Sequence, residues 1–175
     1  MAKWLPTIEY LRECFSYAPE TGALIWKERP LYHFKQAYDQ RAFNAQHAGK
    51  SAARRGGRYG QVNVAYHQFL AHRIIWVMQT GWWPKQIDHA NRDGFDNRWS
   101  NLREATHQQN KWNRTRPKRD LPRGVRKARK GPRFTAAAKV NDRQMHLGSF
   151  DTPEEAHAAW CAAVQRERGE FFRPG

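Results

Sequence analysis

The stretch that decides the fold runs from residue 86 to residue 110 and reads QIDHANRDGFDNRWSNLREATHQQN. Its apolar residues fall in short runs, and carboxylates, amides and histidines fill the space between them. Residues 86–89 end a short strand, a turn-rich loop follows, and residues 102–105 continue as a second strand. Thr106 stands where it can cap a helix that carries Asn110. The sequence therefore predicts a strand, a loop, a second strand and a helix.

This predicted unit holds the side-chain types that phosphodiester hydrolysis requires, namely a base, a group that orients it and ligands for a cation. Asp88 offers a hard oxygen suited to Mg²⁺ or Mn²⁺, and the amide oxygen of Asn110 offers a second. His89, with an ordinary pKa near ~6.5, is predicted to be the general base. Asn101 is predicted to accept a hydrogen bond from the other ring nitrogen of His89 and so to fix its orientation.

The same residues resemble the HNH endonuclease family, in the phage and intron-homing branch whose pattern is DHxxxxxxxNxxxNLRxxTxxxNxxN. The matching positions are Asp88, His89, Asn97, Asn101, Leu102, Arg103, Thr106, Asn110 and Asn113. With upstream segments 59–64 and 71–76, the resemblance covers about residues 48–115. It implies a ββα-metal fold, metal binding by Asp88 and Asn110, base catalysis by His89 and orientation of that base by Asn101.

Other polar residues near this motif have simpler interpretations. An asparagine-rich turn region often only caps backbone groups, and four residues are predicted to anchor the loop outside the site: Asn91, Asp93, Asp96 and Asn97. His107 lies three residues before Asn110 on the same predicted helix, but it does not fall at the family position. His72 opens a predicted helix, where a histidine is more often structural than catalytic.

The chain before the motif predicts a short leader and a hairpin followed by a helix. Thr7 is a candidate cap for a helix with Ile8, Leu11 and Phe15 on one face, and residues 23–26 form an apolar run short enough for a strand. Residues 27–49 show no period and are predicted to be loop. Alternation from residue 60 predicts a β-hairpin that turns at His67-Gln68, and residues 71–78 predict a helix.

The chain beyond the motif predicts a basic linker and a small sheet with one helix. Residues 116–122 contain two prolines and a run of positive charge. Extended runs follow around residues 124–127, 133–140 and 144–150, and then Thr152, Pro153 and Glu155 predict a capped helix. We thus expect an α+β chain: a leader at 1–47, an HNH ββα-metal nuclease domain at 48–115, the linker at 116–122, and a three-stranded antiparallel sheet plus helix at 123–175.

The tail resembles the plant Apetala-two/ethylene-response-factor DNA-binding domain. The resemblance rests on RGVR at 123–126, RFTAAAK at 133–139 and HLGSFDTPEEA at 146–156. It implies that strand residues touch DNA, and Arg123, Arg126 and Lys139 fall where that family has contacting basic residues. Arg133 and Arg143 are predicted to contact phosphate. Ala137 and His146 depart from the plant pattern, so plant sequence preference is not implied.

Composition supports a polyanionic partner. The chain of 175 residues has 31 Lys and Arg against 16 Asp and Glu, a formal net charge of +15. Such a balance suits double-stranded DNA but also basic proteins without activity. Cys14 and Cys161 stand apart, and no signal peptide or membrane-spanning run is seen, so we expect a cytoplasmic protein, in a bacterial or phage-infected cell, without a small-molecule cofactor.

Three functions compete at this point. The first is a metal-dependent DNA endonuclease that nicks DNA or cuts both strands, with the tail guiding target choice. One site per chain cuts one strand, so a double-strand cut needs a homodimer or two visits. The second is a catalytically inactive DNA-binding regulator, and the third is an RNA-processing factor. The complete set of Asp88, His89, Asn101 and Asn110 favours the endonuclease.

Overall fold

The computed structural model describes residues 4–114 and 120–174, so residues 116–119 of the predicted linker lie outside the described residues. The chain divides into two compact units, Met1–Ala105 and Thr106–Gly175. Each unit is described here by itself. In the described part of the chain, no helix has the length and apolar character needed to cross a membrane.

The first unit consists of short helices and three small antiparallel sheets. Its sheets are β1–β2, β3–β4–β5 and β6–β7. In chain order the elements are α1 (Ile8–Cys14), β1 (Phe15–Ala18), β2 (Ala23–Trp26), η1 (Leu31–His33), α2 (Ala37–His47), β3 (Arg54–Gly56), β4 (Tyr59–Val64), β5 (His67–Leu70), α3 (Ala71–Thr80), β6 (Ile87–His89), η2 (Trp99–Asn101) and β7 (Leu102–Glu104).

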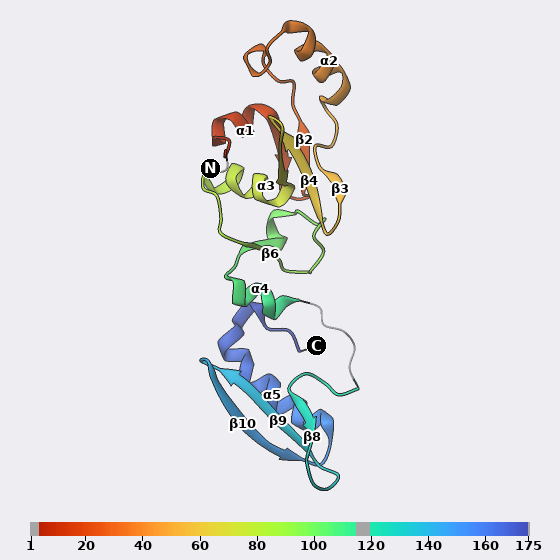
Figure 1. Ribbon diagram of the computed structural model, residues 1–175, viewed down its shortest axis with the longest axis vertical. Coiled ribbons are helices and arrows are strands. Elements are labelled where there is room, and N and C mark those ends of the chain that lie inside the picture. Colours follow the sequence, from red (N-terminus) through yellow and green to blue (C-terminus); the bar gives the residue numbers. More distant parts are fainter. Residues whose placement is uncertain (1–3, 115–119, 175) are drawn as a thin grey trace. The chain divides into compact units, whose positions relative to one another are not determined.

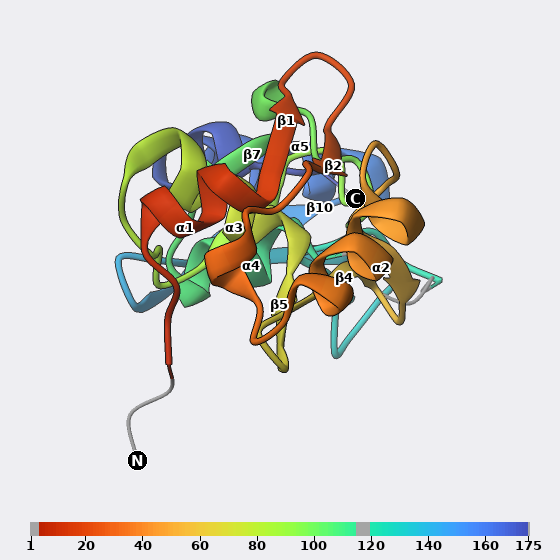
Figure 2. The ribbon, with the colours of Figure 1, turned by 90° about the horizontal axis from the view of Figure 1, so that it is seen from above.

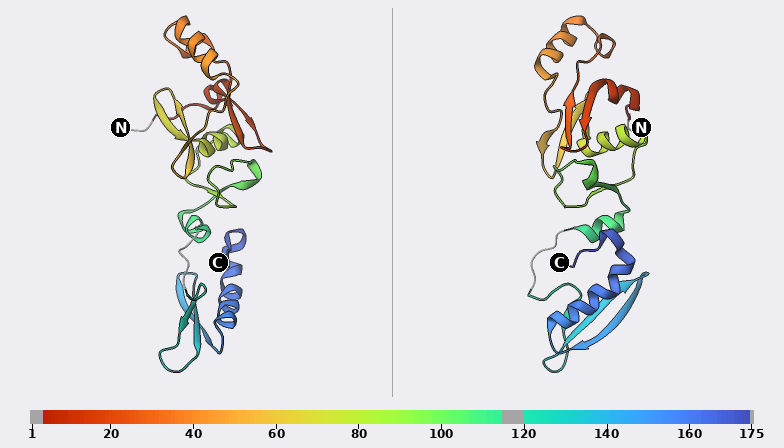
Figure 3. Two further views of the ribbon diagram at one scale, coloured as in Figure 1. Left: turned by 90° about the vertical axis from the view of Figure 1, so that its right-hand side faces the viewer. Right: turned by 180° about the vertical axis from the view of Figure 1, so that it is seen from behind.

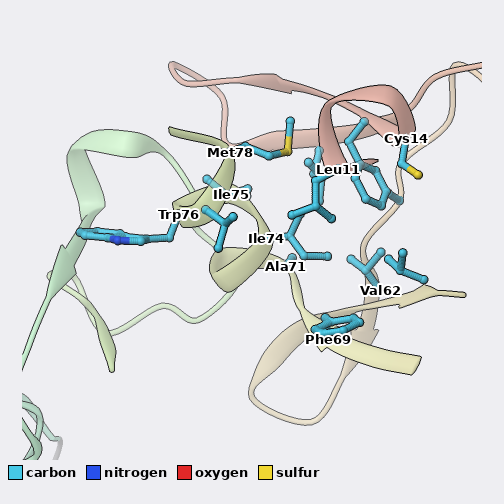
Figure 4. Close-up of a cluster of buried hydrophobic side chains, with 14 of the residues drawn as sticks. Leu11, Cys14, Val62, Phe69, Ala71, Ile74, Ile75, Trp76 and Met78 are labelled. Carbon is cyan, nitrogen blue, oxygen red and sulfur yellow. The ribbon is translucent and has the colours of Figure 1, made fainter. Parts of the chain in front are cut away.

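One hydrophobic core holds this unit together. Leu11 and Cys14 of α1 are fully buried in the same cluster as Val62 of β4 and Ile74 of α3. Figure 4 shows these side chains converging, with Trp76 pointing away from them. The boundary predicted near residue 47 therefore separates two parts of one packed unit, because the leader and the hairpin–helix segment share their core.

The first helix begins where the sequence predicts. The side chain of Thr7 accepts a hydrogen bond from the backbone N–H of Tyr10, and α1 then runs directly into β1 (Figure 2). Phe15 was expected on the helix, but it is the first residue of β1 and pairs with Trp26. The side chain of Phe15 would be buried at the end of the helix as well as at the start of the strand. Hydrophobic spacing alone therefore did not show where the helix ends.

Two local predictions were wrong. Residues 37–47, expected to be loop, form α2, none of whose eleven described residues is buried. A helix without a buried face shows no apolar period, which is why α2 could not be predicted from hydrophobic spacing. The hairpin turns at Ala65-Tyr66, which have φ values of 45° and 66°, while His67 and Gln68 begin β5. Left-handed residues at both central positions suit the twist of a two-residue hairpin, although neither is the usual glycine or asparagine.

The second unit is a small sheet with a helix on one face. Figures 1 and 3 show α5 lying along one side of the sheet, whose antiparallel strand order is β10-β9-β8. A capping box formed by Thr152 and Glu155 starts α5, as predicted. The elements are α4 (His107–Asn113), β8 (Val125–Lys127), β9 (Phe134–Val140), β10 (Arg143–Phe150), α5 (Pro153–Arg168) and η3 (Gly169–Phe171).

The α+β fold class is confirmed by this mixture of helices and small sheets. The predicted strand, loop, strand and helix all occur, as β6, the loop with η2, β7 and α4. Because β6 and β7 belong to the first unit and α4 opens the second, the full ββα-metal arrangement stays a prediction.

Candidate active site

Asp88 lies at the centre of β6 and forms a buried ion pair across the two-stranded sheet. The β6–β7 register places Arg103 opposite Asp88. The Nε and Nη2 atoms of Arg103 donate to Oδ2 of Asp88 at 2.9 and 2.7 Å, and the two side chains are only 13% and 8% exposed. These two hydrogen bonds orient the carboxylate in a shielded position. The sequence indicates this ion pair only through the opposite charges of Asp88 and Arg103, once β6 and β7 are aligned as neighbouring strands.

His89 is buried at the end of β6, with 4% of its surface exposed. Its Nε2 lies 3.1 Å from the amide oxygen of Asn97. An amide oxygen can only accept, so this contact uses the tautomer with hydrogen on Nε2, and Nδ1 is the basic nitrogen. Burial lowers the pKa of His89, while the contact with Asn97 and the charge of Asp88 oppose that shift. His89 is therefore held as an oriented, neutral base.

Asn101 does not make the contact predicted for it. Its amide oxygen accepts from the backbone N–H of Asn91 at 2.9 Å, and its Nδ2 donates to the side chain of Asn91 and to the backbone carbonyl of Asp96. Asn97, which sequence interpretation left outside the site, is the partner of His89 instead. Asn101 closes the loop that presents Asn97, so its effect on His89 is indirect.

The rest of the loop is built from turns, as predicted. The side chain of Asp93 accepts from the backbone N–H of Phe95, and Asn91 donates to Asp96 at 2.7 Å. Arg98 forms a hydrogen-bonded ion pair with Asp96 and lowers the pKa of that carboxyl to about 2. These contacts fix the loop between β6 and η2, which in turn fixes the position of Asn97.

The hairpin of β1 and β2 supports the same loop from the other side. The hydroxyl of Tyr17 donates to the backbone carbonyl of Asn97 at 2.8 Å, and the N–H of Trp99 donates to the carbonyl of Pro19 at 3.0 Å. Burial raises the pKa of Tyr17 to about 12. At Gly22 the backbones approach so closely that a Cβ would lie 2.6 Å from backbone atoms of Asn97 and Arg98. The leader thus helps to position the partner of His89.

Two aromatic rings flank the imidazole of His89. Tyr59 of β4 stacks on it with ring centroids 5.7 Å apart, and His72 of α3 meets it edge-on at 5.0 Å. His72 was predicted to be structural, and the sequence contained no signal that it would lie beside His89. Three elements distant in sequence therefore bring their rings to one point.

The predicted metal ligands lie in different units. Asp88 belongs to the first unit, whereas Asn110 and His107 lie on α4 in the second. Within the described ranges 4–114 and 120–174, no three His, Cys, Asp or Glu side chains gather in a metal-ligating group. The donor chemistry of Asp88 nevertheless fits Mg²⁺, which commonly takes one or two protein oxygens and completes its shell with water and phosphate.

The residues predicted to bind DNA fall on different sides of the second unit. On β9, the buried Ala136 and Ala138 point toward α5, and the positions between and beside them point to the other face. Arg126 pairs with Thr135 of β9, and Lys139 of β9 pairs with Gln144, so both basic residues lie at positions of that other face. Side chains alternate between the faces of a strand. Arg126 and Lys139 therefore share the uncovered face of the sheet, and both are exposed.

The other three predicted contacts are placed differently. Arg133 is half-exposed just before β9 and pairs with Asp151 at 3.0 Å. Arg143 is the first residue of β10 and pairs with Val140, a position on the face of the sheet that α5 covers. The guanidinium of Arg123 lies 5.2 Å from the ring of Trp160, in the packing between sheet and helix. Arg123 is thus engaged in the fold, unlike the exposed Arg126.

Comparison with known proteins identifies the central part of the chain. Residues 69–111 match the family model described as HNH endonuclease. No curated protein and no solved structure matches the chain. The matched segment runs from β5 into α4 and includes Asp88, His89, Asn97, Asn101 and Asn110. The match indicates an HNH endonuclease domain in this segment, and at the family level it indicates a nuclease that acts on DNA.

Proposed function

We propose that this protein is a divalent-metal-dependent DNA endonuclease of the phage or homing type whose C-terminal sheet contributes DNA binding. The observation that carries the proposal is the buried His89, oriented by Asn97 and adjacent to the ion-paired Asp88, inside the HNH segment. Buried, oriented polar groups of this kind are characteristic of catalytic sites rather than of protein cores.

The proposed reaction is hydrolysis of a phosphodiester bond. Nδ1 of His89 accepts a proton from a water molecule as the water oxygen attacks phosphorus, and the bond to the leaving sugar oxygen breaks. The resulting imidazolium keeps donating from Nε2 to Asn97, so the ring does not reorient during the step. Tyr59 and the β1–β2 hairpin limit movement of the ring and of its partner.

Asp88 and Asn110 are the residues proposed to hold a divalent cation, Mg²⁺ or Mn²⁺. Such a cation, when bound, balances negative charge on the scissile phosphate and the leaving oxygen. Arg103 orients the carboxylate of Asp88 by donating two hydrogen bonds to its Oδ2. The part assigned to Asn110 rests on the sequence motif, because Asn110 lies in the second unit.

Target choice is proposed to reside mainly in the second unit. The uncovered sheet face carries Arg126 and Lys139, and Arg133 lies at the start of β9. Exposed cations of this kind contact phosphates and give affinity with steep salt dependence. Between Lys111 and Arg133 the sequence has eleven Lys or Arg and one acid, so this part of the chain has a strong net positive charge.

Incubation with supercoiled plasmid tests the proposal. We expect conversion to nicked or linear DNA with Mg²⁺ or Mn²⁺, and loss of cutting, with binding retained, when EDTA removes the metal. If the protein binds DNA but cuts it with neither Mg²⁺ nor Mn²⁺, the proposed endonuclease activity is contradicted and the inactive regulator is favoured. Competition between duplex DNA and RNA at matched salt distinguishes the RNA-processing alternative.

A further inference from the structure

The β3–β4 hairpin carries exposed arginines that the proposed reaction does not yet use. Arg55 is the second residue of β3, Arg58 lies in the turn that joins β3 to β4, and both are exposed. Tyr59 begins β4 directly after this turn, and its ring stacks on the ring of His89 with centroids 5.7 Å apart. The charged turn is thus next in sequence to a ring that contacts the proposed base.

The loop between β6 and η2 packs against this hairpin. A Cβ added at Gly94 would collide with the backbone carbonyl oxygen of Arg58, so the two backbones are in close contact. The guanidinium of Arg55 lies 4.6 Å from the centre of the Phe95 ring. Both contacts hold the hairpin against the loop that carries the partner of His89.

Arg92 adds a third exposed charge from that loop. Its backbone N–H donates to the carbonyl of His89 at 2.9 Å, and the residue is exposed. Consecutive Cα atoms are about 3.8 Å apart, so the Cα of Arg92 lies within about 7.6 Å of the Cα of Gly94. Three arginines on two adjoining segments therefore surround one part of the loop. We call Arg55, Arg58 and Arg92 the arginine cluster.

The charges of the cluster are available for a ligand. Within residues 4–114 and 120–174, none of its three arginines forms an ion pair or a side-chain hydrogen bond. The neighbouring Arg98 and Arg103 differ, because each is paired with an aspartate of the same region at 2.6 and 2.7 Å. Asp93 of the loop is an exposed acid, and its single charge leaves the three arginines with an excess of positive charge.

The chemistry of the cluster suits phosphate. Arginine stays charged and presents a planar set of donors that matches the oxygens of a phosphate. In the proposed reaction, the ligand that must come to His89 is a phosphate of the strand to be cut. Contacts from two segments restrict the position of that strand more than one contact would, and exact position of the reacting groups governs the rate of the chemical step.

We propose that the arginine cluster is a phosphate-binding site of the first unit, which holds the strand to be cut by phosphates beside the one on which His89 acts. The inference rests on the proposed endonuclease function and assigns new residues to it. The three arginines are positioning residues, because they take no part in proton transfer. The second unit keeps its own proposed contacts, so loss of the cluster should slow cleavage more than it weakens binding.

Charge removal in the full chain tests this site. The double variant Arg55→Gln and Arg58→Gln should cleave about 10- to 100-fold more slowly in single turnover at saturating enzyme. In EDTA, its affinity for duplex DNA should fall only a few-fold, with the slope of log affinity against log salt reduced by about 2. The double variant Arg55→Lys and Arg58→Lys keeps both charges and should cleave at least about 5-fold faster than the Gln variant.

The matched control removes two exposed charges elsewhere in the first unit. Arg41 lies on α2 and Lys35 precedes it, both are exposed, and Figure 1 shows α2 at the far end of this unit from β6. Lys35→Gln with Arg41→Gln should leave the cleavage rate and the salt slope at the wild-type values.

Arg92 allows the charge to be separated from the backbone. Its φ is 70°, a left-handed conformation that asparagine adopts more readily than most residues. Arg92→Asn should therefore keep the wild-type melting temperature and still cleave about 10-fold more slowly. A variant that is stable and cuts at the wild-type rate would remove Arg92 from the cluster.

Neutral phosphates test the contact directly. On a duplex whose cut has been mapped with wild type, single phosphates near the cut are replaced by methylphosphonate. We expect one or two replacements to slow wild type about 10-fold and to slow the Arg55→Gln and Arg58→Gln variant less than about 2-fold, because that variant has already lost the contact. Equal slowing of both proteins at every position would overturn the site.

The outcomes separate this inference from the proposed function. If wild type and the Lys35 and Arg41 control bind DNA but do not cut it, the endonuclease function fails, and the salt slope alone decides whether the cluster binds phosphate. If wild type cuts and the Gln variant cuts equally fast, the positioning role is overturned. A Lys variant as slow as the Gln variant also overturns it, because charge is then not the cause. Melting temperatures establish that all compared proteins are folded.

Discussion

The two units differ in how they place the polar residues that we propose to act on DNA. The first unit buries His72, Asp88, His89, Asn97 and Asn101 around one loop, each with 6% exposure or less. The second unit has a small core of alanines, valines and Trp160, and it carries Arg126 and Lys139 on the uncovered face of its sheet.

This difference suits the roles that we propose for the two units. Groups that do chemistry must be held in fixed geometry and shielded from bulk water. Groups that attract a phosphate backbone act through exposed charge and need less exact placement. We therefore expect changes in the first unit to alter the cleavage rate, and changes on the sheet of the second unit to alter DNA affinity.

The largest expected effect comes from removing the base. His89→Ala should reduce the single-turnover cleavage rate by about 100-fold or more, because general base catalysis contributes roughly that factor. DNA affinity, measured by fluorescence anisotropy, should stay unchanged. A variant that still cuts at the wild-type rate would show that another group is the base. If DNA affinity fell as much as the cleavage rate, His89 would also contribute to DNA binding, and the proposed separation of cleavage and binding between the two units would be wrong.

The next effect concerns the close contact between the β1–β2 hairpin and the loop between β6 and η2. Gly22→Ala should lower the free energy of unfolding by about 3 kcal/mol, because the new Cβ meets the backbone of Asn97 in addition to the left-handed strain. Cleavage by the folded protein should also slow, since Asn97 holds His89. Chemical denaturation and single-turnover cleavage measure the two effects.

Gly49→Ala is the matched control for this contact. Gly49 has the same φ of +76°, but an added Cβ would meet nothing within 4 Å among the described residues. It should lose only about 1 kcal/mol from backbone strain and keep its cleavage rate. Equal losses at Gly22 and Gly49 would indicate that the hairpin does not support the loop.

A smaller effect is expected on the sheet of the second unit. The double variant Arg126→Ala and Lys139→Ala should weaken DNA binding several-fold and reduce the slope of log affinity against log salt by about 2. Cleavage at saturating enzyme should be unchanged. Arg166→Ala removes an exposed arginine on α5 and is the control, with affinity near wild type. If Arg166→Ala weakens binding as much, the uncovered sheet face is not the DNA-binding surface.

The smallest effect is the pH dependence of stability in the first unit. Hydrogen bonds from Tyr32 and His33 lower the pKa of Glu13, and burial lowers the pKa of His33. Both pKa values fall on folding, so the unfolded state binds more protons and stability decreases as pH falls below about 6.5. Glu13→Gln should flatten the acid part of a melting-temperature profile from pH 7 to pH 3. An unchanged profile would show that this pair contributes nothing.

Much of the candidate site was predictable from local patterns. The strand, loop, strand and helix around Asp88 and His89 follow from short apolar runs, turn residues and the cap at Thr106, and all of these act over a few residues. The exposed face with Arg126 follows from strand alternation. Even the pair of Asp88 with Arg103 is implied once the two strands are aligned.

The partners of the predicted base were not predictable in this way. The loop contains several asparagines, and Asn97 rather than Asn101 faces His89 because backbone turns between them set the direction of each amide. The sequence also gave no reason to place Tyr17 beside Asn97, eighty residues away. Contacts between residues so far apart in sequence depend on how the core packs. The pattern of apolar residues predicts which side chains are buried, but not which residues they contact.

The sequence by itself predicted most of the elements, the caps of α1, α4 and α5, and the HNH motif, since each depends on residue type and spacing along the chain. Only the tertiary structure decided that the leader supports the loop between β6 and η2, that Arg123 packs on Trp160, and that His72 lies beside His89. The physical reason is that hydrogen bonds and ring contacts depend on direction and distance in space. These are set only when α3, β4 and the two hairpins close around one core.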